Sequence, residues 1–130
     1  MAETFGMILW DTNILIEFYK AEAQVTEVLR RIGTENIAIS VITKAELFFG
    51  ALNKTELKAI DKLLSLVSLL PITESTSMRF IHLMETYSLS HKLAIPDALI
   101  AATAIENDLP LYTLNQRDFR FVQNLELFKP

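Results

Sequence analysis

Short apolar runs alternate with helical segments along this sequence, and this alternation limits the fold more than any other feature. Strands buried on both faces have continuous apolar sequences, and parallel strands need a crossover connection that is usually helical. The pattern therefore predicts an α/β fold with a parallel sheet covered on both faces. The predicted strands are Gly6–Trp10, NIAIS at 36–40, SLLPIT at 68–73, PLYTLN at 110–115 and, as a fifth candidate, LELF at 125–128.

Helical periodicity fills the segments between these runs. Pro71 suits the third run only near an edge or an end of the sheet. Residues 1–130 contain no internal repeat, low-complexity segment or linker, so we expect a single domain. The predicted helices are 14–20, 25–33 with Gly33 as the stop, 42–52, 55–67, 75–90 and 97–108, the last opened by Pro96 and Asp97.

Composition removes several classes of function. The chain has no cysteine, which excludes a disulfide framework, a thiolate zinc site and a cysteine nucleophile. Twelve basic against 16 acidic residues argue against a nucleic-acid coat that works by bulk charge, but not against an enzyme that contacts nucleic acid locally. The N-terminus does not read as a signal peptide, and no apolar stretch approaches the roughly 18 residues of a membrane span. We therefore expect a cytoplasmic protein without membrane association.

Polar and acidic residues follow two of the predicted strands. Asp11 comes directly after the first strand, and Asn115 and Asp118 come after the fourth. Asp97 opens a helix that is almost entirely apolar and must be buried. Ligand sites of open α/β sheets lie at the carboxyl ends of the strands, so these residues can meet at one edge. Asp11 also suits a helix N-cap, and from the tripeptide alone cap and metal ligand stay open.

Glu46 lies in a segment whose helical wheel has one apolar face. Its side chain projects about 40° from Ile42, at the edge of that face, at ~100° per residue. A carboxylate beside the core is costly unless it is paired, and position i+4 is Gly50. Glu46 is therefore either a boundary residue that reaches solvent or a member of a site. The predicted apolar face consists of Ile42, Ala45, Phe49 and Leu52.

Carboxylates that converge need a counter-charge. Two unit charges 4 Å apart repel by roughly 1 kcal/mol in water and by about 4 kcal/mol at an effective dielectric constant of 20. A hard divalent cation removes this cost, and Mg²⁺ and Mn²⁺ prefer oxygen ligands. Convergence would therefore make Asp11 a metal ligand and leave the capping role to Thr12 and Asn13.

Three fragments together resemble the PIN-domain family, and most closely its small toxin ribonucleases of the VapC type. They are ILWDTNILI, ISVITKAELFFGAL and IPDALIAATAIENDLPLYTLNQRDF, and the resemblance runs from residue 7 to about residue 128. It implies a three-layer α/β/α sandwich with a mostly parallel sheet of about five strands. It also implies Mg²⁺- or Mn²⁺-dependent endonucleolytic hydrolysis of RNA, with 5′-phosphate and 3′-hydroxyl products, by the toxin of a type II toxin–antitoxin pair.

The resemblance also implies site residues. The first three acids of the family correspond to Asp11, Glu46 and Asp97, as catalytic residues and metal ligands. Asn115 stands where the family often has a fourth acid. The carboxylate of Asp118 can replace the missing negative charge by acting through a water molecule. We expect one bound ion rather than two. The auxiliary positions are Thr12, Asn13, Thr113, Asn115 and Asp118.

The implied partners are the RNA substrate, a second copy of the chain and a cognate antitoxin lying along an apolar groove. Lys44, Arg117 and Arg120 either contact the RNA backbone or are ordinary solvated charges. His82 and His91 lack the pattern of a triad or zinc site and are interpreted as structural or surface residues. The large side chains for a groove, or alternatively for the core, are Ile14, Leu15, Phe18, Tyr19, Phe48, Phe49 and Leu52.

Two other functions compete with the nuclease. A catalytically weak or inactive PIN-like module for binding or dimerisation is favoured by Asn115 and opposed by the retention of three acids. A phosphatase with an aspartyl nucleophile needs a second Asp two residues after the first, where this chain has Asn13.

Overall fold

The computed structural model describes residues 6–130. No helix among them has the length and apolar character needed to cross a membrane. The interpretation of the N-terminus falls partly on residues 1–5, which lie outside the described residues. The elements are β1 (Ile8–Trp10), α1 (Thr12–Tyr19), α2 (Ala23–Ile32), η1 (Thr34–Asn36), β2 (Ile37–Ser40), α3 (Val41–Phe49), α4 (Lys54–Leu64), β3 (Ser68–Leu70), α5 (Glu74–Tyr87), α6 (Ile95–Glu106), β4 (Leu111–Tyr112) and η2 (Gln116–Asp118).

The sheet has four strands in the order β3-β2-β1-β4, and all three pairings are parallel. The predicted parallel sheet is confirmed. The fifth run contributes one parallel bridge, between Leu111 and Leu127, instead of a full strand. In this bridge Leu111 N donates to Glu126 O at 2.9 Å and Phe128 N donates to Leu111 O at 2.8 Å. Pro71 directly follows the edge strand β3, as expected.

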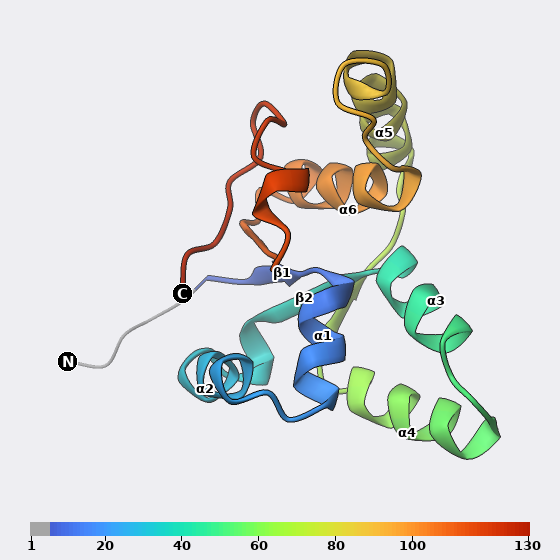
Figure 1. The fold of residues 1–130 in the computed structure, drawn as a ribbon, viewed down its shortest axis with the longest axis vertical. Helices are drawn as coiled ribbons and strands as arrows, with labels where there is room; N and C mark the ends of the chain where they lie inside the picture. The colour runs from blue at the N-terminus through green and yellow to red at the C-terminus, as the bar shows by residue number, and fades with distance from the viewer. Residues whose placement is uncertain (1–5) are drawn as a thin grey trace.

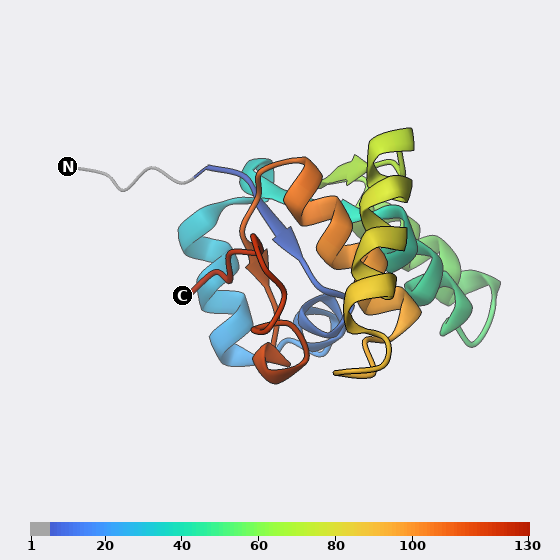
Figure 2. The same ribbon diagram turned by 90° about the horizontal axis from the view of Figure 1, so that it is seen from above.

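Helices cover both faces of the sheet, so the predicted three-layer sandwich is confirmed (Figures 1 and 2). Alternate strand side chains point to opposite faces. Ile8, Trp10 and Ile39 pack into one cluster with residues of α1, α2 and α4. Leu9 and Ala38 pack into a second cluster with residues of α5 and α6. The core is therefore divided in two by the sheet.

Helix α6 is the buried helix that its apolar sequence predicts. It presses small side chains against the sheet and α5, with Ala98, Ala101 and Ala102 all at 0% exposure. Since its first turn carries Asp97, the packing of α6 sets the position of that carboxylate.

The predicted apolar face of α3 is confirmed for Ile42, which packs against the second cluster, and is wrong for Ala45, Phe49 and Leu52. Phe49 is 82% exposed and Leu52 is 85% exposed, and Leu52 lies beyond the end of the helix. Thr43 faces inward instead and is fully buried, because Ser40 Oγ caps the helix by accepting from Thr43 N at 3.2 Å. This buried polar pair sets the rotation of the helix, and it turns Glu46, one helical turn after Thr43, toward the site.

Candidate active site

Asp11 stands at the end of β1, where the strand order reverses between β2 and β4. This is the position at which open α/β sheets hold their ligands. The side chain is only 5% exposed, and both of its oxygens are held. Oδ1 accepts from Thr12 N at 2.8 Å, and Oδ2 accepts from Thr113 Oγ1 at 2.7 Å. The carboxylate is therefore fixed in direction by the residue that follows β4 as well as by its own helix.

The assignment of the capping role to Thr12 and Asn13 is wrong. Asp11 is itself the N-cap of α1, and Thr12 is the first residue of the helix. A cap residue accepts from N–H groups that the helix leaves unpaired, and a carboxylate can do this while another oxygen is used elsewhere. Asn13 instead joins α1 to the segment after β4, because its Oδ1 accepts from Leu114 N at 3.4 Å.

A chain of hydroxyl groups connects β2 to Glu46. The Thr12 hydroxyl donates to Glu46 Oε1 at 2.8 Å and lies 3.0 Å from Thr43 Oγ1. Thr43 Oγ1 lies in turn 3.5 Å from Ser40 Oγ, and both of these side chains are fully buried. Ser40 and Thr43 were not predicted as site residues, although Ser-x-x-Thr at a predicted helix start is a capping signal. The network holds Glu46 inside the site instead of letting it extend into solvent.

Asp97 is the most perturbed acid of the site. Burial in the first turn of α6 raises its pKa to about 6, and the negative charges of Asp11, Asp118 and Glu46 contribute to the rise. Burial also raises the pKa of Asp11, with smaller contributions from Glu46 and Asp118 and opposition from its two hydrogen bonds. The charges of Glu46 and Asp118 therefore act on both Asp11 and Asp97.

The remaining predicted positions follow β4. Thr113 is buried and orients Asp11, and its Oγ1 also accepts from Asn115 N at 3.0 Å. Asn115 is exposed, and within residues 6–130 its side chain makes no hydrogen bond. Asp118 is exposed on η2 and acts through its charge. Asn115, the position at which the sequence has no fourth acid, is thus also exposed to solvent.

The chemistry of this donor set fits a hard divalent cation. All candidate ligands are oxygen atoms, and two carboxylates whose pKa values are raised by burial and by neighbouring negative charge, Asp11 and Asp97, would be stabilised as anions by a positive ion. As the side chains lie, no three acidic or histidine groups within residues 6–130 surround a single point. Glu46 is turned to Thr12, and Asp11 is engaged on both oxygens.

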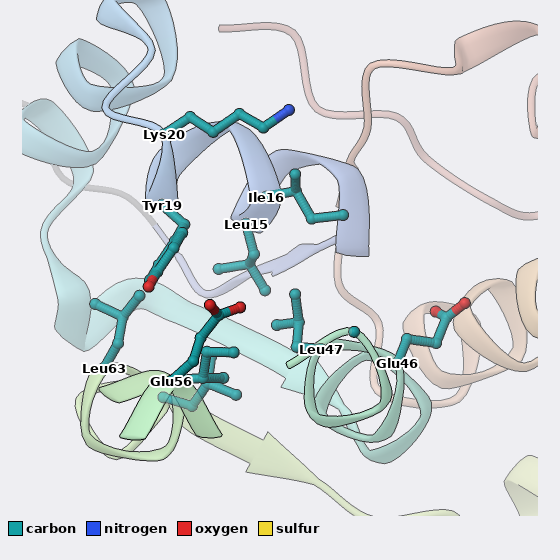
Figure 3. Close-up of a pocket in the computed structure, with 11 residues that line it drawn as sticks. Leu15, Ile16, Tyr19, Lys20, Glu46, Leu47, Glu56 and Leu63 are labelled. Atoms are coloured by element: carbon teal, nitrogen blue, oxygen red, sulfur yellow. The ribbon is translucent and has the colours of Figure 1, made fainter. Parts of the chain in front are cut away.

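An apolar groove lies beside the site, between α1, α3 and α4, with a volume of about 250 Å³. Glu46 sits at its rim with the carboxylate directed away from it, whereas Glu56 points into it (Figure 3). Of the seven large side chains considered for a groove or the core, Leu15 and Tyr19 line the groove. Ile14 belongs to the core, Phe18 and Phe48 pack against the core, and Phe49 and Leu52 are exposed outside the groove.

The PIN domain family model matches residues 8–124. The chain belongs to the PIN-domain family. It is similar to ribonuclease VapC10 of Mycobacterium tuberculosis, with 35% identity over 92% of this chain and 91% of the relative. It also resembles a toxin–antitoxin complex from Klebsiella pneumoniae, with 31% identity, a TM-score of 0.77 and coverage of 91% and 94% of the two chains. DNA-bound VapBC from Salmonella typhimurium shares the fold, with a TM-score of 0.84, 19% identity and coverage of 95% and 98%.

Proposed function

We propose that this PIN domain is a divalent-cation-dependent endoribonuclease and the toxin of a type II toxin–antitoxin pair. The observation that carries the proposal is the rise in the pKa of Asp97 caused by burial and by three other acids at the edge of the sheet. Such an arrangement is unfavourable for folding, because like charges repel and burial disfavours ionisation. Strongly perturbed acids that gather in this way are typical of functional sites. The similarity to proteins named ribonucleases supports the same activity.

The cation we propose is Mg²⁺ or Mn²⁺, held by Asp11 and Asp97 with Glu46 beside them. When bound, it supplies positive charge for a phosphoryl oxygen and lowers the pKa of a water. Asn115 adds no charge at the fourth corner, so we expect one ion instead of two. Asp118 is close enough to influence Asp97 electrostatically, and its negative charge would add to the attraction for the ion.

The other proposed roles, proton acceptance and the orientation of Asp11, belong to side chains and backbone groups of the protein. Glu46 is the proposed acceptor of the proton from the attacking water: Thr12 holds its Oε1, which leaves Oε2 for the proton. Thr113 and the backbone of Thr12 keep Asp11 in one orientation. Fixed orientation matters because a displacement of about 1 Å in an active site can cost roughly 100-fold in rate.

The test is cleavage of a broad RNA panel by wild-type protein, Asp11→Asn and Asp97→Asn with Mg²⁺, Mn²⁺ or EDTA. We expect cleavage by the wild type only with a divalent cation, and its loss in both variants while their circular dichroism spectra stay native. Glu85→Gln, an exposed carboxylate on α5, is the matched control and should cleave normally. Wild-type protein that leaves the whole panel intact under both ions would contradict the proposal.

The second candidate is a PIN-like module without activity, favoured by the open, uncharged corner at Asn115. Calorimetry with Mn²⁺ separates the two functions. Binding that Asp97→Asn abolishes supports the nuclease, and the absence of binding supports the module.

The proposed protein partners are a second copy of this chain and an antitoxin. Similarity to toxin–antitoxin complexes supports the antitoxin. We place its apolar segment in the groove of Leu15, Tyr19 and Leu47, with a basic side chain opposite Glu56. Two exposed apolar residues one turn apart on α5, Met78 at 68% and Ile81 at 53% exposure, suit the contact between copies. An antitoxin that binds Tyr19→Ala as tightly as wild type would refute the groove assignment.

A further inference from the structure

A second cleft adjoins the acids on the side away from the apolar groove. It has a volume of about 570 Å³ and is bounded by the turn between α5 and α6 and by the segment around η2. Figure 2 shows these two segments, coloured yellow-orange and red, next to each other. Asp97 and Asp118 form part of its wall, so the cleft opens directly onto the proposed site of cleavage.

Three other residues of this wall are basic, in a protein with a formal net charge of −4. Lys92, Arg117 and Arg120 line the cleft, and all three are exposed. The ion pairs within residues 6–130 use other side chains, so among the described residues these three cations form no ion pair. Cations concentrated in a concave surface attract a polyanion through the focused local field, despite the overall charge.

The cleft also contains stacked aromatic rings. The rings of His91 and Phe121 are 4.1 Å apart and nearly parallel, at 11°, and both residues line the cleft. Tyr87 meets Phe121 edge-on at 5.1 Å, and Tyr87 Oη accepts from Gln123 N at 3.0 Å. Ser90 Oγ lies 2.8 Å from His91 Nδ1. His91 is exposed while Phe121 is half-buried, so the stack is preorganised and its outer member faces solvent.

We infer that this cleft binds single-stranded RNA beside the cleavage site. An unpaired base continues the His91–Phe121 stack, and Arg117, Arg120 and Lys92 contact the flanking phosphates. Aromatic stacking beside a basic channel is how proteins hold single strands, whereas a duplex keeps its base faces inside the helix. The inference rests on the proposed ribonuclease function and specifies the form of its substrate. It also gives His91, interpreted from the sequence as structural or surface, a role in substrate binding.

The test measures binding of a fluorescent single-stranded RNA of mixed sequence to the whole protein in EDTA, where no cleavage takes place. We expect His91→Ala to weaken binding roughly fivefold or more, the loss typical of one stacked base. His91→Phe should restore affinity, because the replacement keeps an aromatic ring. His82→Ala, an exposed histidine of α5 outside the cleft, is the matched control.

The role of the basic residues is tested by the salt dependence of RNA binding. The Arg117→Ala/Arg120→Ala double variant should lower the slope of log affinity against log salt by about 0.7 for each phosphate that the variant no longer neutralises. Lys58→Ala, an exposed cation on α4, should leave the slope unchanged. Wild-type protein that does not bind the single strand, or that binds a duplex of the same sequence equally well, overturns the inference.

The outcomes separate this inference from the proposed function. With Mg²⁺, His91→Ala should raise KM and leave kcat nearly unchanged, whereas Asp97→Asn should abolish kcat. Binding that depends on His91 in a protein that never cleaves RNA would support the cleft and reject the nuclease. If His91→Ala cleaves RNA with unchanged Kd and KM, the result would support the nuclease and reject the cleft as its binding site.

Discussion

Replacement of Asp97 by asparagine should make the protein more stable while it removes the proposed activity. Burial and neighbouring acids raise the pKa of Asp97 from 3.8 to about 6. Each pKa unit corresponds to about 1.4 kcal/mol, which bounds the cost of the ionised form at about 3 kcal/mol. The carboxylate is only half-buried, so screening by solvent reduces the expected cost to about 1–2 kcal/mol.

The sign of the pH dependence follows from the same numbers. The native state binds the proton of Asp97 more tightly than the unfolded state does. Its contribution to the free energy of unfolding therefore falls as pH rises from 3.8 to about 6, and the loss persists above that range. Since asparagine carries no charge, the variant should gain most at pH 7.5 and gain little below pH 4.

Urea unfolding in EDTA across this pH range tests the reasoning. We expect Asp97→Asn to exceed wild type by about 1–2 kcal/mol at pH 7.5, or by about 4–8 °C in Tm. Glu85→Gln should stay within about 0.5 kcal/mol of wild type at each pH. With Mn²⁺ the difference in the free energy of unfolding between Asp97→Asn and wild type should become smaller, because only wild type is stabilised by binding the ion. A variant that is less stable at pH 7.5, or a difference that does not change with pH, would refute the charge argument.

Three further changes test the core, the site and the surface. Leu9→Ala, at a fully buried position of β1, should lower the free energy of unfolding by about 2–5 kcal/mol, measured in urea. Thr113→Val removes the donor to buried Asp11 and should cost about 1.5–3 kcal/mol at pH 7; a smaller loss at pH 3, where Asp11 is protonated, would confirm that the bond is to a charged group. Met78→Asp, on the exposed face of α5, should reduce self-association in sedimentation while changing stability by less than about 0.5 kcal/mol.

Part of the candidate site could be read directly from the chain. Asp11 follows a four-residue apolar run, and Asp97 opens an apolar helix, so each is tied to the end of a local element. The ends of parallel strands meet at one edge of a sheet, which predicts that such residues converge. Burial is the main cause of the raised pKa of Asp97, and the charges of Asp11, Asp118 and Glu46 add to it.

Other parts of the site depend on how elements cross in space. Thr113 donates to Asp11 across 102 positions of the chain, and Thr12 donates to Glu46 across 34. The helical wheel of α3 predicted the inward face wrongly except at Ile42, because buried Ser40 and Thr43 set its rotation. The periodicity of a single segment does not predict these contacts or the rotation of α3, because both depend on how two segments pack against each other.

The sequence by itself determined the class of fold, the parallel sheet, the buried helix α6 and the acids at the strand ends. These follow from hydrophobicity and residue type within short segments, which act locally. The tertiary structure decided the strand order, the single bridge at Leu127, the rotation of α3 and the stacking of His91 on Phe121. Each of these is a contact between distant residues, and such contacts form only when packing brings their elements to a definite distance and angle.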